Sequence, residues 1–366
     1  MYGNGKPVIV VGAGPAGLLT SLFIRNREVL ILEEHREVGK PKHCAGFTGL
    51  DTARRLIKTA GWSVVENSYK VLVFYTPKGR YRLAFKTPMV YRINRPLLEE
   101  KLLDRVLRIG HRVVFKTKAK PGSRAGYVKA LGGELEGSYV IACDGARSIF
   151  RAKYCGTYEK HLVGVQHVYR ASGLDDDTIH LIFNSATPDF FQWLAPIDYD
   201  LVLVGFATHR YSIHPDKIVE YIARTTRVEL TTRIESFGGL IPRTKPMDKP
   251  VIHNRVVFIG DSVPITKPYT GGGLMPISIL APVLGTSINS GNLEPYLALY
   301  RGLLKRVKAE YIATITAEKV GYWIPPYVVY HIYRLSLLSI QDYDKHYKLL
   351  LKALAISPYV LPKILS

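Results

Sequence analysis

Cysteine is scarce in this sequence. Only three cysteines occur in 366 residues, Cys44, Cys143 and Cys155. Three thiols cannot form a closed disulfide framework or an ordinary zinc site, and without a cysteine cluster an iron–sulfur centre is disfavoured. We therefore expect reduced thiols and no metal.

Acidic residues are also few, with 30 Asp and Glu against 50 Lys and Arg and a formal net charge of +20. Such a balance favours an anionic partner, such as a phosphorylated substrate, an acidic membrane surface or a nucleic acid. Because the lysines are spread along the chain, a merely well-solvated basic surface is the alternative. No module that interleaves aromatic and basic residues is evident, so a nucleic acid partner is not expected.

No segment of the sequence resembles a signal peptide or a membrane span. The first apolar run leads straight into a glycine turn and has no cleavage region, so we expect a cytoplasmic protein. The longest uncharged stretch, residues 268–293, contains Pro276, Pro282 and five glycines. This composition predicts a buried helix behind a cofactor loop.

The amino-terminal part has the pattern of a strand, a helix and a parallel strand. Val8 to Val11 and Val29 to Leu32 are short apolar runs rich in β-branched residues, and they flank a helix-like segment from Pro15 to Arg25. With 47% hydrophobic residues the chain can bury a full core. An α/β fold with a parallel sheet is therefore predicted.

Further elements follow from periodicity and turn residues. Helices are expected over residues 51–58, 96–109 and beyond 294, with an interruption at Pro325-Pro326. Strands are expected over 69–75 and 80–85, joined by a hairpin turn, and over 113–115, 126–131, 139–142 and 256–259. The consecutive strand-like runs from His161 to Phe206 predict an antiparallel sheet.

This order implies a Rossmann-like cofactor domain into which a second, antiparallel sheet domain is inserted. The expected cofactor domain comprises residues 1–68, 91–157 and 248–293. The expected substrate domain comprises 69–90 and 158–247, and a helical region covers 294–366.

A glycine motif follows the first strand. It consists of Gly12, Ala13, Gly14, Pro15, Ala16 and Gly17. Glycines here let backbone N–H groups approach a pyrophosphate, and an acid after the second strand, Glu33 with Glu34 beside it, is placed to bind ribose hydroxyls. This context predicts a site for an adenosine diphosphate group and disfavours a 2′-phosphate.

Downstream segments add to this site. Asp261 follows an apolar strand, and Pro268 and the run Gly271, Gly272, Gly273, Leu274 precede a long helix whose amino terminus would favour an anionic reduced ring. Asp144-Gly145, Arg95 and Ala119 complete the candidate ligands. Each alone is compatible with a turn, a helix cap or a solvated arginine, but together they predict FAD.

Three stretches resemble the geranylgeranyl reductase family, a group of FAD-dependent oxidoreductases with the hydroxybenzoate-hydroxylase fold. Residues 39–46 resemble its Pro-x-x-Cys-x-Gly segment, residues 260–273 its flavin signature, and residues 191–196 with 205–207 its prenyl-pocket pattern. Four positions depart from the family: Phe191 replaces a tyrosine, Ala195 a phenylalanine, Ala207 a glycine, and Pro264 a small residue.

The resemblance implies saturation of C=C bonds in geranylgeranyl chains of an archaeal-type lipid or a prenyl diphosphate. It places Cys44, Ala45 and Gly46 beside the flavin, with Cys44 as a catalytic candidate. Phe191 and Trp193, with Pro196 and Gly205, would form the substrate pocket and position the chain. Alternatively, Cys44 is a small buried apolar residue, and Phe191 and Trp193 are core aromatics.

The electron donor is left open, because no second glycine motif marks a nicotinamide domain; NAD(P)H and ferredoxin are both candidates. The segment from Trp323 to Ile364 is expected either to contact an anionic membrane peripherally or to form a helical cap on the core. Two alternative functions are a flavin monooxygenase of the same fold and an FAD electron-transfer dehydrogenase that acts with a quinone or a partner protein.

Overall fold

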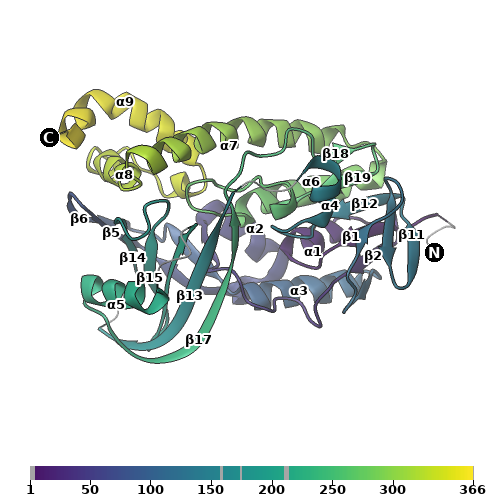
Figure 1. Ribbon diagram of the computed structural model, residues 1–366, viewed down its shortest axis with the longest axis horizontal. Coiled ribbons are helices and arrows are strands. Elements are labelled where there is room, and N and C mark those ends of the chain that lie inside the picture. The colour runs from purple at the N-terminus through teal and green to yellow at the C-terminus, as the bar shows by residue number, and fades with distance from the viewer. Residues whose placement is uncertain (1–4, 157–159, 174, 210–213, 366) are drawn as a thin grey trace.

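The computed structural model describes residues 5–156, 160–173, 175–209 and 214–365. Residues 1–4, 157–159, 174, 210–213 and 366, which fall in the expected domain ranges, lie outside the described residues. Two large sheets lie at opposite ends of the molecule, and a long helix, α7, runs along its length above them (Figure 1).

The first sheet has six strands, all parallel except the first. Its order is β18 (Val251–Ile252), β19 (Val256–Phe258), β12 (Tyr139–Ala142), β1 (Val8–Val11), β2 (Val29–Leu32) and β8 (Arg112–Val114). Every residue of β1 and β2 is buried. Continuous apolar runs suit such strands because both faces of the sheet are covered.

Helices cover this sheet, and α1 packs against both α3 and α6. Their bounds are α1 (Pro15–Ser21), α2 (Leu50–Ala60), α3 (Arg95–Arg108) and α6 (Leu274–Ser290). The predicted first helix extended to Arg25, but it ends at Ser21. The chain then turns, and the side chain of Asn289 accepts hydrogen bonds from the backbone of Arg25 and Asn26, which replaces further helical pairing. The helix predicted behind the cofactor loop is α6, and most of it is buried.

The second large sheet has seven strands. Its order is β17 (Glu229–Pro242), β13 (His161–Ser172), β16 (Leu201–Thr208), β15 (Gln192–Asp198), β14 (Thr178–Ile182), β5 (Val71–Thr76) and β6 (Gly79–Ala84). The strands between residues 161 and 206 pair antiparallel as predicted, whereas β14 pairs parallel with β5. Helix α5 (Pro215–Thr226) packs on one face of this sheet.

Two smaller sheets and a short helix complete this part of the fold. They are the sheet β3 (Phe47–Gly49), β7 (Val90–Ile93) and β4 (Val65–Tyr69), the sheet β11 (Gly133–Glu136), β10 (Tyr127–Ala130) and β9 (Lys120–Pro121), and the helix α4 (Ile149–Cys155). The strand predicted over residues 69–75 is divided, because Tyr69 ends β4 and β5 begins at Val71. The N–H groups of Lys70 and Val71 both donate to the carbonyl of Asp177 at this division.

Three helices form the carboxy-terminal region: α7 (Glu294–Val320), α8 (Ile324–Arg334) and α9 (His346–Leu365). The predicted interruption at Pro325-Pro326 is displaced. The break lies at residues 321–323, where Gly321 has a φ of +141°. The two prolines instead occupy the first turn of α8, where a missing N–H costs no helical hydrogen bond. Among the described residues, no helix is long and apolar enough to cross a membrane.

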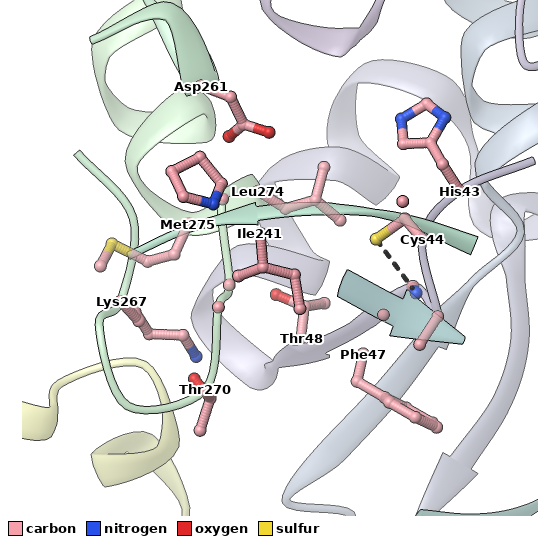
Figure 2. A pocket seen from close by; sticks show the side chains of 18 of the residues that line it. His43, Cys44, Phe47, Thr48, Ile241, Asp261, Lys267, Thr270, Leu274 and Met275 are labelled. Carbon is pink, nitrogen blue, oxygen red and sulfur yellow. Dashed lines mark hydrogen bonds between the residues drawn. The ribbon is translucent and has the colours of Figure 1, made fainter. Parts of the chain in front are cut away.

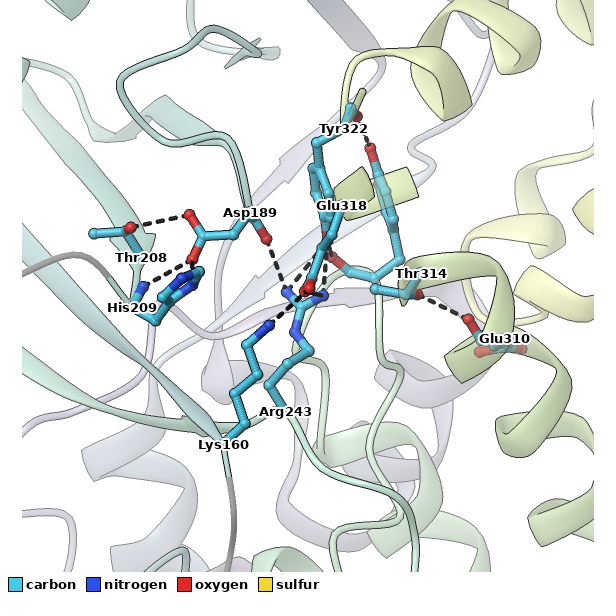
Figure 3. Close-up of polar contacts among 10 residues, drawn as sticks. Lys160, Asp189, Thr208, His209, Arg243, Glu310, Thr314, Glu318 and Tyr322 are labelled. Atoms are coloured by element: carbon cyan, nitrogen blue, oxygen red, sulfur yellow. Dashed lines mark hydrogen bonds and ion pairs between the residues drawn. The ribbon is translucent and has the colours of Figure 1, made fainter. Parts of the chain in front are cut away.

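A buried arginine joins the carboxy-terminal helices to the second sheet (Figure 3). Arg243, 1% exposed, directly follows β17. Its Nη1 lies 3.2 Å from Oε1 of Glu318 on α7, and its Nη2 donates to the carbonyl of Asp189 at 3.3 Å. Lys160 donates to the second oxygen of Glu318 at 2.8 Å. These contacts pair charges that would otherwise be buried alone.

The same arginine is linked through Tyr322 to the loop that was predicted to bind the flavin. Both Nη atoms of Arg243 lie 3.3 Å from the hydroxyl of Tyr322, which lies between α7 and α8. The rings of Tyr322 and Tyr269 stack with their centroids 4.3 Å apart, and each hydroxyl donates to the backbone carbonyl of the other residue. The loop that contains Tyr269, the helices α7 and α8, and the seven-stranded sheet therefore meet at one polar joint.

Replacing Arg243 by methionine leaves Glu318 buried with only Lys160 as its charged partner. We expect the free energy of unfolding, measured by urea denaturation, to fall by about 3–5 kcal/mol. The matched control is Arg224→Met, because Arg224 pairs with Glu220 at 3.8 Å on the surface, with side chains 83% and 65% exposed. The control should change stability by less than about 1 kcal/mol. Equal effects of both substitutions would contradict the role given to Arg243.

Candidate cofactor and substrate site

The candidate cofactor groove lies at the carboxyl edge of the parallel sheet. Four parallel strands, β1, β2, β12 and β19, end there, and they are followed by Gly12, Glu33, Cys143 and Gly260. Ligands of open α/β sheets bind at this edge, because all the strands deliver their following loops to it. The segments that the sequence separates by more than 200 residues therefore meet at one place.

Two glycines after β1, Gly17 and Gly14, differ in what a larger side chain would meet at their positions. A Cβ on Gly17 would lie 2.0 Å from the carbonyl oxygen of Gly12, so this glycine is needed for the close contact between helix and strand. Gly14 has an ordinary φ of −72°, and a Cβ there would meet no atom within 4 Å. The space above Gly14 is thus open to a ligand and is not needed by the fold.

Glu33 is held at the wall of this groove. It is 7% exposed, and its Oε2 accepts a hydrogen bond of 2.6 Å from the backbone N–H of Ala13. Its Oε1 accepts another from the N–H of His35 at 2.9 Å. Glu34 and Ala119 line the same cavity farther along. The carboxylate is thereby oriented without help from a distant side chain.

Arg95 lies at the start of α3 and faces the groove. Its Nε and Nη2 donate to Oε1 of Glu99 at 3.1 and 2.8 Å, and the other oxygen of Glu99 accepts from the N–H of Gly39. Only 13% of the arginine side chain is exposed. Glu99 therefore fixes the guanidinium while leaving Nη1 available to a phosphate.

Two aspartates face the groove from β12 and β19. Burial raises the pKa of Asp144 and of Asp261, although His43 and Arg95 oppose the effect at Asp261. The Oδ1 of Asp144 is buried and has no hydrogen-bond partner. An oxygen left in this state costs free energy unless a ligand donor meets it, so Asp144 is placed to bind a cofactor hydroxyl or N–H.

The predicted flavin-facing residues converge from three segments (Figure 2). Cys44, Asp261 and Leu274 all line one cavity, as do Ala45, Gly46, Gly145, Gly271, Gly272 and Gly273. The Sγ of Cys44 accepts a hydrogen bond from the N–H of Gly46 at 3.4 Å. Pro268 does not line the cavity; it lies within the tight turn closed by the hydrogen bond from Gly271 N to the carbonyl of Lys267 at 2.8 Å. The cysteines Cys44, Cys143 and Cys155 are free.

The cavity continues from the groove into an apolar space, with a total volume of about 1060 Å³. Phe191 and Trp193 line it from the second sheet. Phe190 stacks on Phe191 with ring centroids 4.2 Å apart, which fixes the ring of Phe191. This wall is aromatic and apolar, as expected for a pocket that binds hydrocarbon.

Two predicted pocket residues do not reach the cavity. The carbonyl of Pro196 accepts hydrogen bonds from Tyr69 at 2.6 Å and from Asn67 at 3.1 Å, behind the wall. Gly205 supports Trp193 from behind, because a Cβ there would lie 2.5 Å from the indole. Pro196 and Gly205 therefore support the wall of the cavity but do not line the cavity itself. Gly17 is likewise structural.

Sequence reasoning missed the third wall of the cavity. It is formed by the carboxy-terminal helices through Ala313, Ile324, Val328, Val329, Ile332, Leu349, Leu350 and Ala353. Their apolar spacing predicts buried helix faces, and no local pattern distinguishes a face against a cavity from a face against a core. Only the tertiary arrangement reveals the difference.

A buried polar cluster, also missed, lies between the cofactor loop and these helices. We call Lys267, Glu310, Asp344 and His346 the Lys267 cluster. Lys267 Nζ donates to the carbonyl of Tyr343 at 3.0 Å and lies 3.8 Å from Oδ1 of Asp344. Burial lowers the pKa of both Lys267 and His346. Because Lys267, Glu310 and His346 line the cavity, the apolar space has one polar end.

Glu310 is the member of the cluster with an unpartnered carboxyl oxygen. One oxygen accepts from the N–H of Tyr347 at 2.9 Å, whereas Oε2 is buried without a hydrogen-bond partner. Burial raises the pKa of Glu310 to about 7, although the charge of Lys267 opposes the shift. Near neutral pH this carboxyl therefore holds a proton in a substantial fraction of molecules.

Comparisons with known proteins agree with this geometry. Residues 6–275, more than half of the chain, match the model of the FAD binding domain family. The chain therefore belongs to that family, which confirms the predicted cofactor, FAD.

Two curated relatives, from Methanocaldococcus jannaschii and Methanothrix thermoacetophila, are each 27% identical to the chain. The first is an uncharacterized protein, and the similarity covers 81% of this chain and 80% of the relative. The second is named digeranylgeranylglycerophospholipid reductase, with 78% of this chain and 79% of the relative covered.

A solved structure has the same fold. It is a geranylgeranyl bacteriochlorophyll reductase-like protein of Thermoplasma acidophilum, with a TM-score of 0.71 and 19% identity, and the match covers 93% of this chain and 90% of that one. The predicted fold class, an FAD-binding α/β fold with an inserted sheet and carboxy-terminal helices, is confirmed.

Substitutions at two neighbouring glycines should separate cofactor binding from folding. Gly14→Ala puts a methyl group into the open space, so the apoprotein should keep its stability while the Kd for FAD rises at least about tenfold, or ~1.4 kcal/mol. Gly17→Ala meets the backbone of Gly12 and should destabilise the apoprotein itself by about 1–3 kcal/mol. Flavin fluorescence titration and thermal melting give the two readouts. Unchanged FAD affinity in Gly14→Ala would place the cofactor elsewhere.

Glu310 should make stability depend on pH. A carboxyl whose pKa is raised in the folded state keeps its proton there more readily than in the unfolded chain, so stability falls as pH rises from about 4.5 to 7. For a shift of this size the loss is on the order of 3 kcal/mol. Urea denaturation at pH 5 and pH 8 should show a smaller loss in Glu310→Gln, which cannot ionise. Identical pH dependence in both proteins would contradict the assignment.

Proposed function

We propose that this protein is an FAD-dependent reductase that saturates C=C bonds in the geranylgeranyl chains of an archaeal-type membrane lipid. One observation carries the proposal: a single cavity joins the glycine-lined groove to an aromatic and aliphatic space. A hydride donor and a long hydrocarbon chain can therefore meet without water between them. The similarity to digeranylgeranylglycerophospholipid reductases supports this choice of substrate class.

The residues of the groove fit FAD. The open space above Gly14 suits the pyrophosphate, and the fixed carboxylate of Glu33 suits ribose hydroxyls. The unpartnered oxygen of Asp144 and the side chains of Arg95 and Asp261 supply further polar contacts. When bound and reduced, FAD supplies the hydride; the protein supplies orientation and a dry site.

The apolar walls position the chain. Phe191 and Trp193 form one wall, and Val328 and Val329 of α8 belong to the opposite, helical wall. Apart from the indole N–H of Trp193, these side chains carry no polar groups, so a hydrocarbon chain can shift along the cavity and successive double bonds can be presented at the same point. An isolated alkene is a poor hydride acceptor, so this positioning accounts for much of the rate.

Cys44 is proposed to act where the groove meets the apolar space. Its Sγ accepts the hydrogen bond from Gly46, which holds the sulfur in place on the cavity wall. The thiol hydrogen can then be directed towards the cavity, where saturation of an alkene requires a proton beside the hydride.

The partners are proposed from charge and chemistry. A phospholipid or a prenyl diphosphate has an anionic head, which suits a chain with a net charge of +20. The electron donor is either NAD(P)H or a ferredoxin-like protein. We place the protein in the cytoplasm, in peripheral contact with an anionic membrane.

The test is to incubate the FAD-loaded protein with dithionite under anaerobic conditions and to analyse the lipid by mass spectrometry. We expect hydrogenation of geranylgeranyl phospholipid or of geranylgeranyl diphosphate. No hydrogenated product from either compound, together with oxygen-dependent hydroxylation of an aromatic compound, would overturn the proposal.

Cys44→Ala tests the proposed role of the thiol in the same assay. Losing a positioned proton donor should slow hydrogenation by about a hundredfold, with FAD content unchanged. Cys155→Ala is the matched control, because Cys155 is exposed and does not line the cavity; it should retain the full rate. A Cys44→Ala protein as fast as the control would exclude Cys44 as the proton source.

A further inference from the structure

Helix α9 has an apolar side that nothing in the described chain covers. Leu351 is 63% exposed, Leu354 70% and Leu361 52%. Their spacing of three and seven residues places them on one side of the helix. These three large apolar side chains form a stripe along one side of the helix, which marks an interaction surface more strongly than scattered exposed residues do.

The other side of α9 faces inward. Leu349, Leu350 and Ala353 line the apolar cavity. Farther along the helix, Ile356 and Val360 are buried and form a cluster with residues of α8. The helix is therefore a single layer between the cavity and the outside. Whatever binds the outer stripe lies one helix diameter from the proposed substrate.

All the charged side chains of α9 are basic. Its 20 residues include Lys348, Lys352 and Lys363 and no aspartate or glutamate. Lys348 is exposed, whereas Lys352 pairs with Asp342. A helix with an apolar stripe and only basic charges fits a lipid surface that has an apolar interior and anionic head groups. A second copy of the chain fits less well, because two such helices would bring lysines together.

We propose that Leu351, Leu354 and Leu361 on α9, together with Lys348, form a docking surface for an anionic lipid bilayer. Resting on the proposed function, we add that the lipid substrate passes from that bilayer into the cavity beside α9. The docking itself does not depend on the reaction. The stripe enters the acyl boundary, and the lysine contacts the head groups.

Sedimentation with vesicles tests the docking on the full-length, FAD-loaded protein. Vesicles of phosphatidylcholine with phosphatidylglycerol should bind the protein at low salt. Binding should weaken with added salt and with pure phosphatidylcholine, because head-group attraction is screened or absent. The variant Leu351→Glu/Leu354→Glu should bind at least about tenfold more weakly.

Leu131→Glu is the matched control. Leu131 is 60% exposed and lies in the turn between β10 and β11, at the opposite end of the molecule from α9 (Figure 1). Since all three leucines are exposed, both variants should keep the melting temperature and FAD content of the original protein. The control should bind vesicles as the original protein does.

Three results would overturn the docking surface: no vesicle binding by the original protein, equal loss of binding in the control, or full binding by the α9 variant. If the α9 variant instead abolishes a concentration-dependent dimer and leaves vesicle binding intact, the stripe is a contact between copies. Vesicle binding is measured without turnover. Its failure is therefore distinct from failure of the proposed reduction, which is assayed with detergent-dispersed lipid.

Discussion

The buried ion pair between Arg243 and Glu318 is the interaction on which the rest of the architecture depends. It joins the end of the seven-stranded sheet to α7, and through Tyr322 it reaches the cofactor loop at Tyr269. Apolar contacts between these helices and the rest of the chain are not directional, whereas the polar contacts of this joint are directional, as are the hydrogen bonds from the N–H groups of Gly49 and Thr52 to Asp344. Buried charges must be paired in a defined geometry, so the joint fixes where the third wall lies.

Two different constraints meet in the cavity. At the parallel sheet, backbone geometry shapes the groove. The glycines allow the helix and strand backbones to approach closely, and backbone N–H groups orient the carboxylate of Glu33. At the second sheet, side-chain packing shapes the cavity wall. Phe190 stacks on Phe191, and the absence of a side chain at Gly205 leaves room for the indole of Trp193. One region is lined by polar groups and the other by apolar side chains, and the proposed reaction needs both within one continuous space.

Much of the cofactor groove could be predicted from the sequence, because its determinants are local. A glycine turn after one strand and an acid after the next strand indicate a site for a dinucleotide. Gly12 and Glu33 lie directly after β1 and β2, at the edge of the sheet where such a site is expected. Pro196 and Gly205 were expected in the pocket but lie behind it. Pro196 is three residues from Trp193 in β15 and so lies on the opposite face of the sheet, and Gly205 pairs with Trp193 and is covered by its indole. The Lys267 cluster and the cavity face of α9 depend on contacts distant in sequence, so no local pattern reveals them.

The central claim is that reduced flavin and an unsaturated chain react within one cavity. Anaerobic stopped-flow absorbance tests it most directly, by mixing the reduced protein with geranylgeranyl lipid or with the fully saturated lipid of the same length. The account predicts that the absorbance of oxidised flavin returns only with the unsaturated chain. Equal return with both lipids, or return only after oxygen is admitted, would contradict it.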